Sequence, residues 1–286
     1  MIQAHDKDAL RVVMRGYRSN AETTAFVPTL GNLHDGHLSL VRKAKEVADR
    51  VVVSIFINPT QFDKAEDLAA YPRTIDNDLK LLKKEAIDLV FLPEADEMYP
   101  EGSAARVEVD GISDILEGDS RPGHFSGVAT IVAKLFNLVQ PDISVFGEKD
   151  FQQLMLVRRM VDDLDFGIKI IGAPTAREES GLAMSSRNNY LNEEQRNKIA
   201  PNLYAELKKI ETALYNGEKD HKKLQKEASE NLNEQGFTTD YIEIRNAVDL
   251  SIATKDNEDL VILVSAWLGK ARLIDNLRVN LDDIRF

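Results

Sequence analysis

The stretch Pro-Thr-Leu-Gly-Asn-Leu-His-Asp-Gly-His, residues 28–37, is the basis of the fold prediction. It follows a short apolar run, Phe26-Val27, and leads into a helical pattern. Glycine lets the backbone approach a ligand closely, and a helix N-terminus directs unpaired N–H groups at anions. His34 and His37 add further hydrogen-bond donors. The stretch therefore predicts a nucleotide-phosphate site at a strand-to-helix turn, and with it an ATP-using enzyme.

The first half of the chain alternates short β-branched runs with helix-length amphipathic segments, a pattern typical of a parallel sheet. The expected strands are residues 25–27, 51–57, 88–92 and 143–146. Because ligands of open α/β sheets bind beyond the carboxyl ends of the strands, we expect the chemistry at the turns after Val27, Ile57 and Phe146. The apolar faces of two expected helices consist of Leu38, Val41 and Ala48 after Gly36, and of Val128, Ile131, Leu135 and Leu138 after Gly127.

Beyond Pro174 the pattern changes. Charged helical segments are expected over about 193–215 and 220–235, the first with Asn192 and Gln195 as a capping box, and strands at 241–244, 260–264 and 271–274. We therefore predict an α/β protein with a Rossmann-like, doubly wound parallel sheet in a catalytic domain of residues 1–175. Residues 176–286 are predicted to form a smaller C-terminal α+β domain that acts as a lid.

Composition limits the classes of function. The 286 residues are 43% hydrophobic and 29% charged, which is an ordinary globular balance. With 36 Lys and Arg against 48 Asp and Glu, the net charge of −12 disfavours a nucleic acid or an anionic membrane as partner. The absence of cysteine excludes disulfides and a thiolate nucleophile. No signal peptide or membrane span is evident, so we expect a cytoplasmic protein.

Four further clusters contain candidate binding residues, and each also has a plain structural interpretation. Residues 58–62 place two amides and an aromatic after a strand, but they also suit a capped turn. Residues 121–127 suit an anion or an ordinary helix entry. Lys149, in residues 146–153, suits a phosphate or a surface charge cluster. Residues 183–188 place two serines and an arginine in a loop that could close on phosphates.

The order of these motifs resembles a known family. The His34–His37 element and the later Met184–Arg187 loop resemble the two signatures shared by class I aminoacyl-tRNA synthetases and the cytidylyltransferase-like nucleotidyltransferases. Between them, residues 54–62, 71–74, 121–125 and 147–153 are similar to the pantothenate synthetase family, and the resemblance covers the chain from about Val27 to Leu191.

The resemblance implies a ligase that condenses pantoate with β-alanine to give pantothenate. ATP would activate the pantoate carboxylate as a bound pantoyl adenylate, with AMP and pyrophosphate as products. No covalent enzyme intermediate is needed, which agrees with the absence of cysteine. Catalysis would then consist of positioning and charge stabilisation. The resemblance also implies a homodimer.

The resemblance implies roles for the residues that match the motifs of the family. His34 and His37 would meet the ATP phosphates, with His37 as proton donor; a structural role is the alternative for this pair. Lys149 would hold the transferring phosphates and Asp150 would contact the ribose, while Ser185, Ser186 and Arg187 would close over the triphosphate. The remaining expected ATP contacts are Leu30, Gly31, Gly36, Gly147, Glu148, Ala176 and Met184.

Amides would bind the other substrates. Gln61 and Gln153 match the pantoate-binding amides, Gln61 would also meet β-alanine, and Asn58 is grouped with them. Pantoate carries geminal methyl groups, so it also needs an apolar wall, although plain core packing is the simpler interpretation for each candidate. The candidates for this wall are Pro28, Leu30, Val128, Ile131 and Phe146.

Three positions depart from the family pattern. Leu30 stands where methionine is common, a swap of similar volume. Arg187 replaces the lysine of the synthetase version of the loop, giving a permanently charged fork suited to phosphate. Asn77 interrupts the acidic run of residues 76–78 that would otherwise suit Mg²⁺. We therefore expect no dedicated metal site, with Mg²⁺ held through the ATP phosphates.

Other functions share part of this evidence. A phosphopantetheine-type or cytidylyl nucleotidyltransferase would share the histidine element but usually has a shorter chain. An aminoacyl-tRNA synthetase needs a large basic surface, which this acidic chain lacks. A non-catalytic nucleotide sensor is the third alternative.

Overall fold

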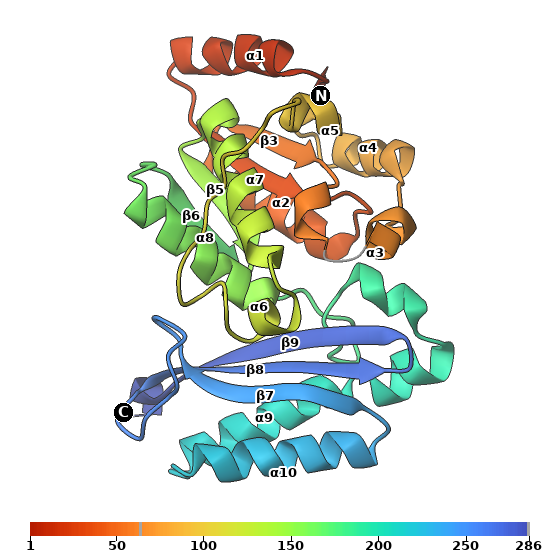
Figure 1. The fold of residues 1–286 in the computed structure, drawn as a ribbon, viewed down its shortest axis with the longest axis vertical. Helices are drawn as coiled ribbons and strands as arrows, with labels where there is room; N and C mark the ends of the chain where they lie inside the picture. Colours follow the sequence, from red (N-terminus) through yellow and green to blue (C-terminus); the bar gives the residue numbers. More distant parts are fainter. Residues whose placement is uncertain (63–64, 285–286) are drawn as a thin grey trace. The chain divides into compact units, whose positions relative to one another are not determined.

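The computed structural model describes residues 1–62 and 65–284. The chain forms two compact units (Figure 1). The first comprises Met1–Glu148 and Gln152–Pro174, and the second comprises Lys149–Phe151 and Thr175–Phe286. The short segment Lys149–Phe151 therefore belongs by its contacts with the later part of the chain.

The first unit contains a six-stranded parallel sheet with strand order β1-β4-β3-β2-β5-β6. Its strands are β1 (Ile2–Ala4), β2 (Thr24–Thr29), β3 (Arg50–Ile55), β4 (Leu89–Phe91), β5 (Ile143–Gly147) and β6 (Lys169–Ala173). The four expected strands are confirmed, with shifted ends. The two that were not predicted, β1 and β6, are the edges of the sheet, where short strands carry a weak hydrophobic pattern.

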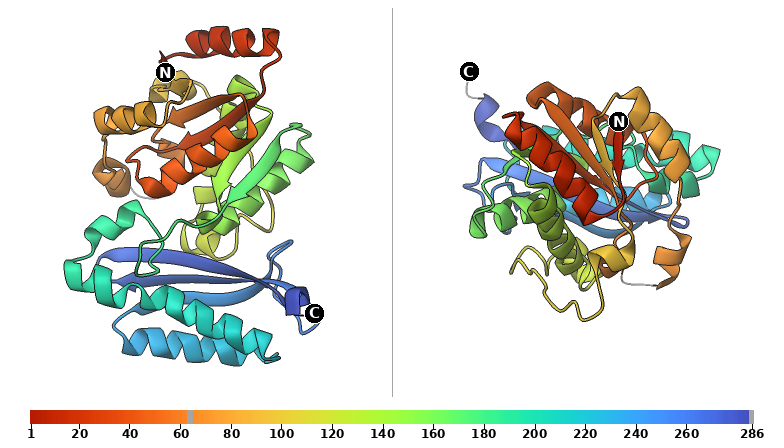
Figure 2. Two further views of the ribbon diagram at one scale, coloured as in Figure 1. Left: turned by 180° about the vertical axis from the view of Figure 1, so that it is seen from behind. Right: turned by 90° about the horizontal axis from the view of Figure 1, so that it is seen from above.

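Helices cover both faces of this sheet, so the expected doubly wound arrangement is confirmed. Figure 1 shows α7 in front of the sheet, and the reverse view in Figure 2 shows α2 in front of it. One face carries Val27 and Val53 against the apolar side of α2. On the other, Phe26 meets Phe136 of α7 edge to face, with ring centroids 6.4 Å apart. The helices of this unit are α1 (Lys7–Ser19), α2 (Asp35–Val47), α3 (Ala65–Ala70), α4 (Ile75–Lys84), α5 (Ala95–Met98), α6 (Glu117–Ser120), α7 (His124–Val139) and α8 (Phe151–Asp163), with the 3₁₀ turn η1 (Pro59–Gln61). The 3₁₀ turn η2 (Glu148–Asp150) begins in this unit, and its last two residues belong to the second.

The two expected apolar helix faces differ in outcome. All four residues expected on α7 are buried, as predicted. On α2, Leu38 and Val41 are buried, but the prediction for Ala48 is wrong. Ala48 caps the helix in an extended conformation, and Ala44 takes the buried position one turn earlier.

The second unit contains a three-stranded antiparallel sheet in the order β7-β8-β9. Its strands are β7 (Thr238–Asn246), β8 (Asp259–Leu268) and β9 (Ala271–Asn280), longer than the apolar runs that predicted them. Helices α9 (Asn202–Tyr215) and α10 (His221–Glu234) share one hydrophobic core with this sheet. The unit also includes the short turns η3 (Ser186–Tyr190) and η5 (Leu281–Ile284).

The prediction of one continuous helix over 193–215 is wrong, because the helix is interrupted. The segment η4 (Gln195–Ile199) is a π-helix, and α9 begins only at Asn202. Pro201 lies between them and has no N–H to continue an α-helical ladder, while the Ala200 N–H donates to the Gln195 carbonyl at 2.7 Å. The capping box is confirmed: Asn192 N donates to Gln195 Oε1 at 3.1 Å, and Gln195 N to Asn192 Oδ1 at 2.8 Å.

Among the helices of the described residues, none combines the length and the apolar character needed to span a membrane.

Candidate active site

The turn after β2 requires glycine. Gly31 has a φ of 85° and Asn32 one of 52°, so the chain passes through two consecutive left-handed residues. A Cβ on Gly31 would lie 2.9 Å from Ile55 Cγ2 and 3.1 Å from Asp78 Oδ2. Backbone conformation and close packing therefore both exclude a side chain at Gly31.

Asp78 holds this turn from α4. Its side chain is buried, at 1% exposure. Oδ2 accepts from Asn32 N at 2.9 Å and Oδ1 from Leu33 N at 2.8 Å, and the Thr74 hydroxyl lies 3.1 Å from Oδ1. From the sequence, this residue was interpreted only as part of an acidic run. Its partners lie 45 and 46 residues away, so no local pattern indicated the role.

His34 and His37 form the N-terminal cap of α2. Nδ1 of His34 accepts from Gly36 N at 3.1 Å, and Nδ1 of His37 accepts from His34 N at 3.4 Å. The ring centroids lie 4.2 Å apart. A backbone N–H can only donate, so in the neutral rings the proton is on Nε2. The pair thus has the structural role considered above, and in this geometry each ring is also an Nε2–H donor at a helix N-terminus.

Asn58 and Gln61 are brought together directly after the adjacent strand β3. Asn58 Nδ2 donates to Gln61 Oε1 at 3.0 Å and to the Gly127 carbonyl at 3.1 Å. The Tyr99 hydroxyl donates to Asn58 Oδ1 at 2.8 Å. Asn58 has no exposed surface. Its amide is committed within the protein, so the geometry does not favour the direct substrate contact expected of Asn58.

Arg121 and His124, considered above as anion ligands, contact the main chain of Gln61. His124 Nδ1 donates to the Gln61 carbonyl at 2.7 Å, and Arg121 Nη2 donates to the same oxygen at 3.4 Å. Arg121 caps the end of α6, and His124 begins α7. Helix α7 lies close to η1: a Cβ on Gly127 would be 2.3 Å from the Thr60 carbonyl. Gln61 is therefore held at its backbone as well as at its side chain.

The two glutamines at the start of α8 differ. Gln152 is 3% exposed, and its Nε2 donates to the Ile112 and Ile115 carbonyls at 2.8 and 2.7 Å. Gln153, the predicted ligand, is half-buried. The residues expected to form an apolar wall include Val128, Ile131 and Phe146, each only 3–4% exposed, which agrees with their alternative as core residues. Pro28 and Leu30 are half-buried, as are Gly36, Gly147 and Glu148.

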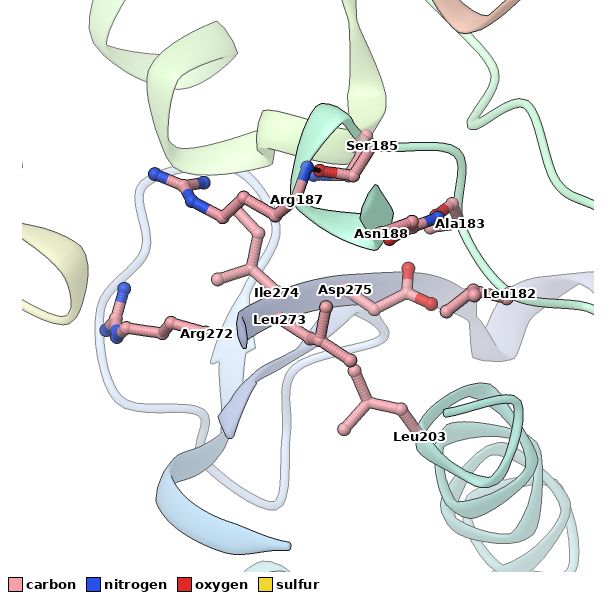
Figure 3. Close-up of a pocket in the computed structure, with 11 residues that line it drawn as sticks. Leu182, Ala183, Ser185, Arg187, Asn188, Leu203, Arg272, Leu273, Ile274 and Asp275 are labelled. Carbon is pink, nitrogen blue, oxygen red and sulfur yellow. Dashed lines mark hydrogen bonds between the residues drawn. The ribbon is translucent and has the colours of Figure 1, made fainter. Parts of the chain in front are cut away.

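The second unit contains a small pocket (Figure 3). It brings together three predicted phosphate ligands, Lys149, Ser185 and Arg187. Met184 and Ser186 lie in the same loop but do not line the pocket, and Asp150 is exposed, 3.8 Å from Lys149 Nζ. The remaining lining residues are Leu182, Ala183, Asn188, Leu203, Arg272, Leu273, Ile274 and Asp275.

The serine loop is shaped by its own polar groups. Ser185 Oγ accepts from Arg187 N at 3.2 Å and so caps η3. Asn188 is buried and donates to the Ala183 carbonyl at 3.0 Å. Met184 N donates to the Ala176 carbonyl at 2.9 Å, so a backbone hydrogen bond joins Ala176 to the serine loop. Arg187 itself is exposed, so its guanidinium is accessible to a phosphate.

A buried ion pair supports this pocket. Arg177 donates to both carboxylate oxygens of Asp275, at 2.6 and 2.9 Å, and its guanidinium carbon lies 3.6 Å from the centre of the Tyr204 ring. The Asp275 side chain is only 2% exposed. Beside it on β9, Asn276 Nδ2 donates to the Lys149 carbonyl at 2.8 Å. No candidate role was predicted for Arg177, Tyr204, Asp275 or Asn276, because none of them belongs to a motif and their partners are distant in sequence.

Strand topology places the first unit's candidates at one edge. Strands β2 and β3 are parallel neighbours, with Thr29 opposite Ile55, and β5 pairs with β2 on the other side. The segments that follow all three strands therefore lie at the carboxyl edge of the sheet, where open α/β sheets bind ligands. This arrangement places two imidazoles at the N-terminus of α2 and an oriented amide after β3.

Among residues 1–62 and 65–284, no group of three or more His, Asp or Glu side chains is arranged to hold a metal ion. The carboxylate that holds the histidine turn, Asp78, uses both oxygens for the protein's own donors.

Known proteins are similar to this chain over nearly its whole length. Residues 3–278 match the family described as pantoate-beta-alanine ligase. The pantothenate synthetase of Thermus thermophilus is 44% identical, with a TM-score of 0.90, over 97% of this chain and 99% of that one. The pantoate-beta-alanine ligase of Francisella tularensis, solved as a complex with beta-gamma ATP and beta-alanine, is 37% identical, with a TM-score of 0.82, over 97% of each chain. This chain therefore belongs to the pantoate–β-alanine ligase family.

Proposed function

We propose that this ligase uses ATP to activate pantoate as a bound pantoyl adenylate, which β-alanine then converts to pantothenate. In the first step a pantoate carboxylate oxygen bonds to the α-phosphorus of ATP as the bond to pyrophosphate breaks. In the second, the β-alanine amine bonds to the activated carbonyl carbon, the bond to AMP breaks, and the amine loses a proton. The Francisella relative's ATP and β-alanine complex supports the choice of substrates.

The observation that carries this proposal is the pairing of two functions at the carboxyl edge of adjacent strands. After β2, His34 and His37 carry Nε2–H donors at the N-terminus of α2. After β3, Gln61 offers a held amide. The first set suits phosphate oxygens on which charge develops, and the second suits a small polar acid.

We propose phosphate binding by the second unit's pocket as well. Lys149 and Arg187 provide positive charge, and Ser185 lies with them on the pocket wall. We propose that Ser186, Met184 and Ala176 also contact the triphosphate. Asp150 remains a proposed contact of the ribose. Leu30, Gly31, Gly36, Gly147 and Glu148 remain proposed ATP contacts through the segments after β2 and β5.

Pantoate is proposed to bind Gln61 and Gln153, with apolar contacts from Pro28, Val128, Ile131 and Phe146. Mg²⁺ is proposed to arrive with ATP, where it would neutralise phosphate charge. The homodimer implied by the family resemblance also remains a proposal; light scattering should then give twice the chain mass of 32.1 kDa. A cytoplasmic location is likewise still a prediction, which cell fractionation would check.

An oxygen-labelling experiment tests the adenylate. Pantoate labelled with ¹⁸O in its carboxylate is incubated with ATP, Mg²⁺ and β-alanine, and the products are analysed by mass spectrometry. An adenylate intermediate transfers one labelled oxygen to AMP, because the carbonyl carbon loses the oxygen that was bonded to phosphorus. Label in orthophosphate or pyrophosphate instead of AMP contradicts the proposal. Omitting either pantoate or β-alanine is the control, and sustained AMP release should need both.

A further inference from the structure

The orientation of the Asn58 amide is determined by groups with only one hydrogen-bonding role. The Gly127 carbonyl can only accept, so the Asn58 atom 3.1 Å from it is the nitrogen. On the other side, the backbone N–H of Thr60 can only donate, and it lies 3.4 Å from Asn58 Oδ1. The Tyr99 and Thr60 hydroxyls donate to the same oxygen, at 2.8 and 3.0 Å.

The orientation of the Gln61 amide follows from that of Asn58. The second hydrogen of Asn58 Nδ2 points to Gln61 at 3.0 Å, so the Gln61 atom that receives it is Oε1. Nε2, with its two N–H donors, is therefore directed away from Asn58. Within the described part of the chain, no residue accepts a hydrogen bond from Gln61 Nε2.

We infer that Tyr99 and Asn58 are positioning residues that make Gln61 present its Nε2 donors, and not its oxygen, to a carboxylate- or hydroxyl-bearing substrate. A carboxylate can only accept, so a glutamine turned the other way would repel it. The inference depends on the proposed function for the identity of that substrate, pantoate. The proposed function assigned no role to Tyr99.

The surroundings of Tyr99 suit this role. Lys134 Nζ lies 5.0 Å from the centre of its ring, and the Phe56 ring centroid lies 6.4 Å away, so the ring is held on several sides. Burial raises the pKa of Tyr99 above its ordinary value of 10.0, and the hydrogen bond with Thr60 acts in the opposite direction. The hydroxyl therefore keeps its proton at neutral pH and can donate to Asn58.

The first test is Tyr99→Phe, which removes only the hydroxyl. We expect the KM for pantoate to rise about three- to tenfold, because one neutral hydrogen bond that orients the amide is lost. The KM for ATP and the melting temperature should stay close to those of the parent. Tyr17→Phe is the matched control: Tyr17 is a 9%-exposed tyrosine in the same unit, with the Arg50 guanidinium 5.3 Å from its ring centre. An unchanged pantoate KM in Tyr99→Phe, or an equal loss for every substrate together with a lower melting temperature, overturns the inference.

The second test identifies the presented atom. Gln61→Glu keeps the shape and the acceptor for Asn58 but replaces the Nε2 donors with a carboxylate oxygen. We expect its pantoate KM to rise at least as much as in Gln61→Ala, by about tenfold or more. A smaller rise in Gln61→Glu than in Gln61→Ala would mean that an oxygen faces the substrate, which overturns the inference.

The Gln61→Ala variant also separates this inference from the proposed function. If Gln61→Ala leaves the pantoate KM unchanged, the proposed binding role of Gln61 fails, and the positioning roles fail with it. If Gln61→Ala raises the KM and Tyr99→Phe does not, only the positioning roles fail. In the double variant, Tyr99→Phe should add nothing to the effect of Gln61→Ala, because its effect passes through that amide.

Discussion

Single residues at this site combine a structural role with a proposed chemical one. His37 is an example, since its Nδ1 accepts from the His34 N–H while its Nε2 carries a proton. A ring held in this way is a fixed donor that needs no rearrangement as charge develops on a phosphate. The cap uses one side of the imidazole, and the proposed chemistry would use the other.

We expect His37→Ala to lower the rate of adenylate formation by about 10²-fold or more, because a donor aimed at developing charge is lost. Loss of the cap should cost only about 1 kcal/mol of folding free energy. Pyrophosphate release without β-alanine, in a single turnover, measures the first effect, and urea unfolding measures the second. His37→Asn, which can still accept a backbone hydrogen bond, controls for the cap. Near-normal pyrophosphate release in His37→Ala would rule out the chemical role.

The buried pair of Arg177 and Asp275 is a second case at this scale. Removing only one partner leaves an uncompensated buried charge, so we expect Asp275→Ala to lower the free energy of unfolding by about 3–5 kcal/mol. The double variant Arg177→Met/Asp275→Leu should lose much less, because both charges leave together. Chemical denaturation of the three proteins checks the difference. If Asp275→Ala has the same free energy of unfolding as the double variant, the remaining Arg177 charge is not isolated from water.

At the scale of elements, the loops of the first unit are held by contacts from other elements. Asp78 of α4 ties the turn between β2 and α2, and the start of α7 ties η1. Gly31 and Gly127 are both required by close approach, one to Asp78 and Ile55 and the other to the Thr60 carbonyl. The candidate groups thus rest on regular elements, which keep them in place better than loop residues alone would.

We expect Asp78→Asn to destabilise the turn, because an amide has one acceptor oxygen where two are used. One backbone N–H, of Asn32 or Leu33, would lose its acceptor, at a cost of about 1–3 kcal/mol. Adenylate formation should fall with it, since the turn positions His34. Urea unfolding and pyrophosphate release measure the two effects, with exposed Asp76→Asn as control. If Asp78→Asn loses the expected unfolding free energy but forms the adenylate at the parent rate, the turn does not position the reacting groups.

The connection between α2 and β3 predicts a pH effect. Asp49 Oδ2 accepts from Thr23 Oγ1 at 2.6 Å and from Thr23 N at 2.8 Å. These hydrogen bonds, the side-chain one foremost, lower the pKa of Asp49 below its ordinary value of 3.8. A lowered folded-state pKa stabilises the protein above the unfolded pKa, and this stability is lost as the pH falls through the folded pKa.

We therefore expect the melting temperature of the parent to fall more steeply below about pH 4 than that of Asp49→Asn. The exposed variant Glu230→Gln is the control and should follow the parent. Because Asp49 is at the surface, salt should reduce the difference. If the melting temperatures of the parent and Asp49→Asn fall equally steeply with decreasing pH, the predicted role of Asp49 is wrong.

At the scale of the whole molecule, the proposed binding of ATP is coupled to folding. Ligand that binds only the folded state stabilises it by about 2.7 kcal/mol at a hundred times its dissociation constant. For a chain of this size, Mg-ATP should then raise the melting temperature by roughly 5 °C. Lys149→Ala should reduce this rise, whereas exposed Lys222→Ala should not. A full ATP-induced rise in Lys149→Ala, measured by calorimetry, would contradict its phosphate role.

Much of the fold was predictable because hydrophobic periodicity is local. The four interior strands, the helix after Gly127 and the capping box at Asn192 all follow from patterns within one or two turns of chain. The edge strands β1 and β6 were not found, because short edge strands need little apolar surface. The break before α9 depended on Pro201, whose effect the helical pattern obscured.

For the candidate site too, local patterns were predictable from the sequence and long-range contacts were not. The motif residues and the family could be read from the sequence, since ordered motifs such as residues 28–37 and 183–188 are continuous runs of chain. Which groups are committed inside the protein became evident only from the folded contacts. Asp78, Tyr99 and Asp275 take their roles from partners tens of residues away, and the same contacts orient Gln61. Hydrogen bonds between distant segments depend on the folded arrangement of the chain, which no local pattern contains.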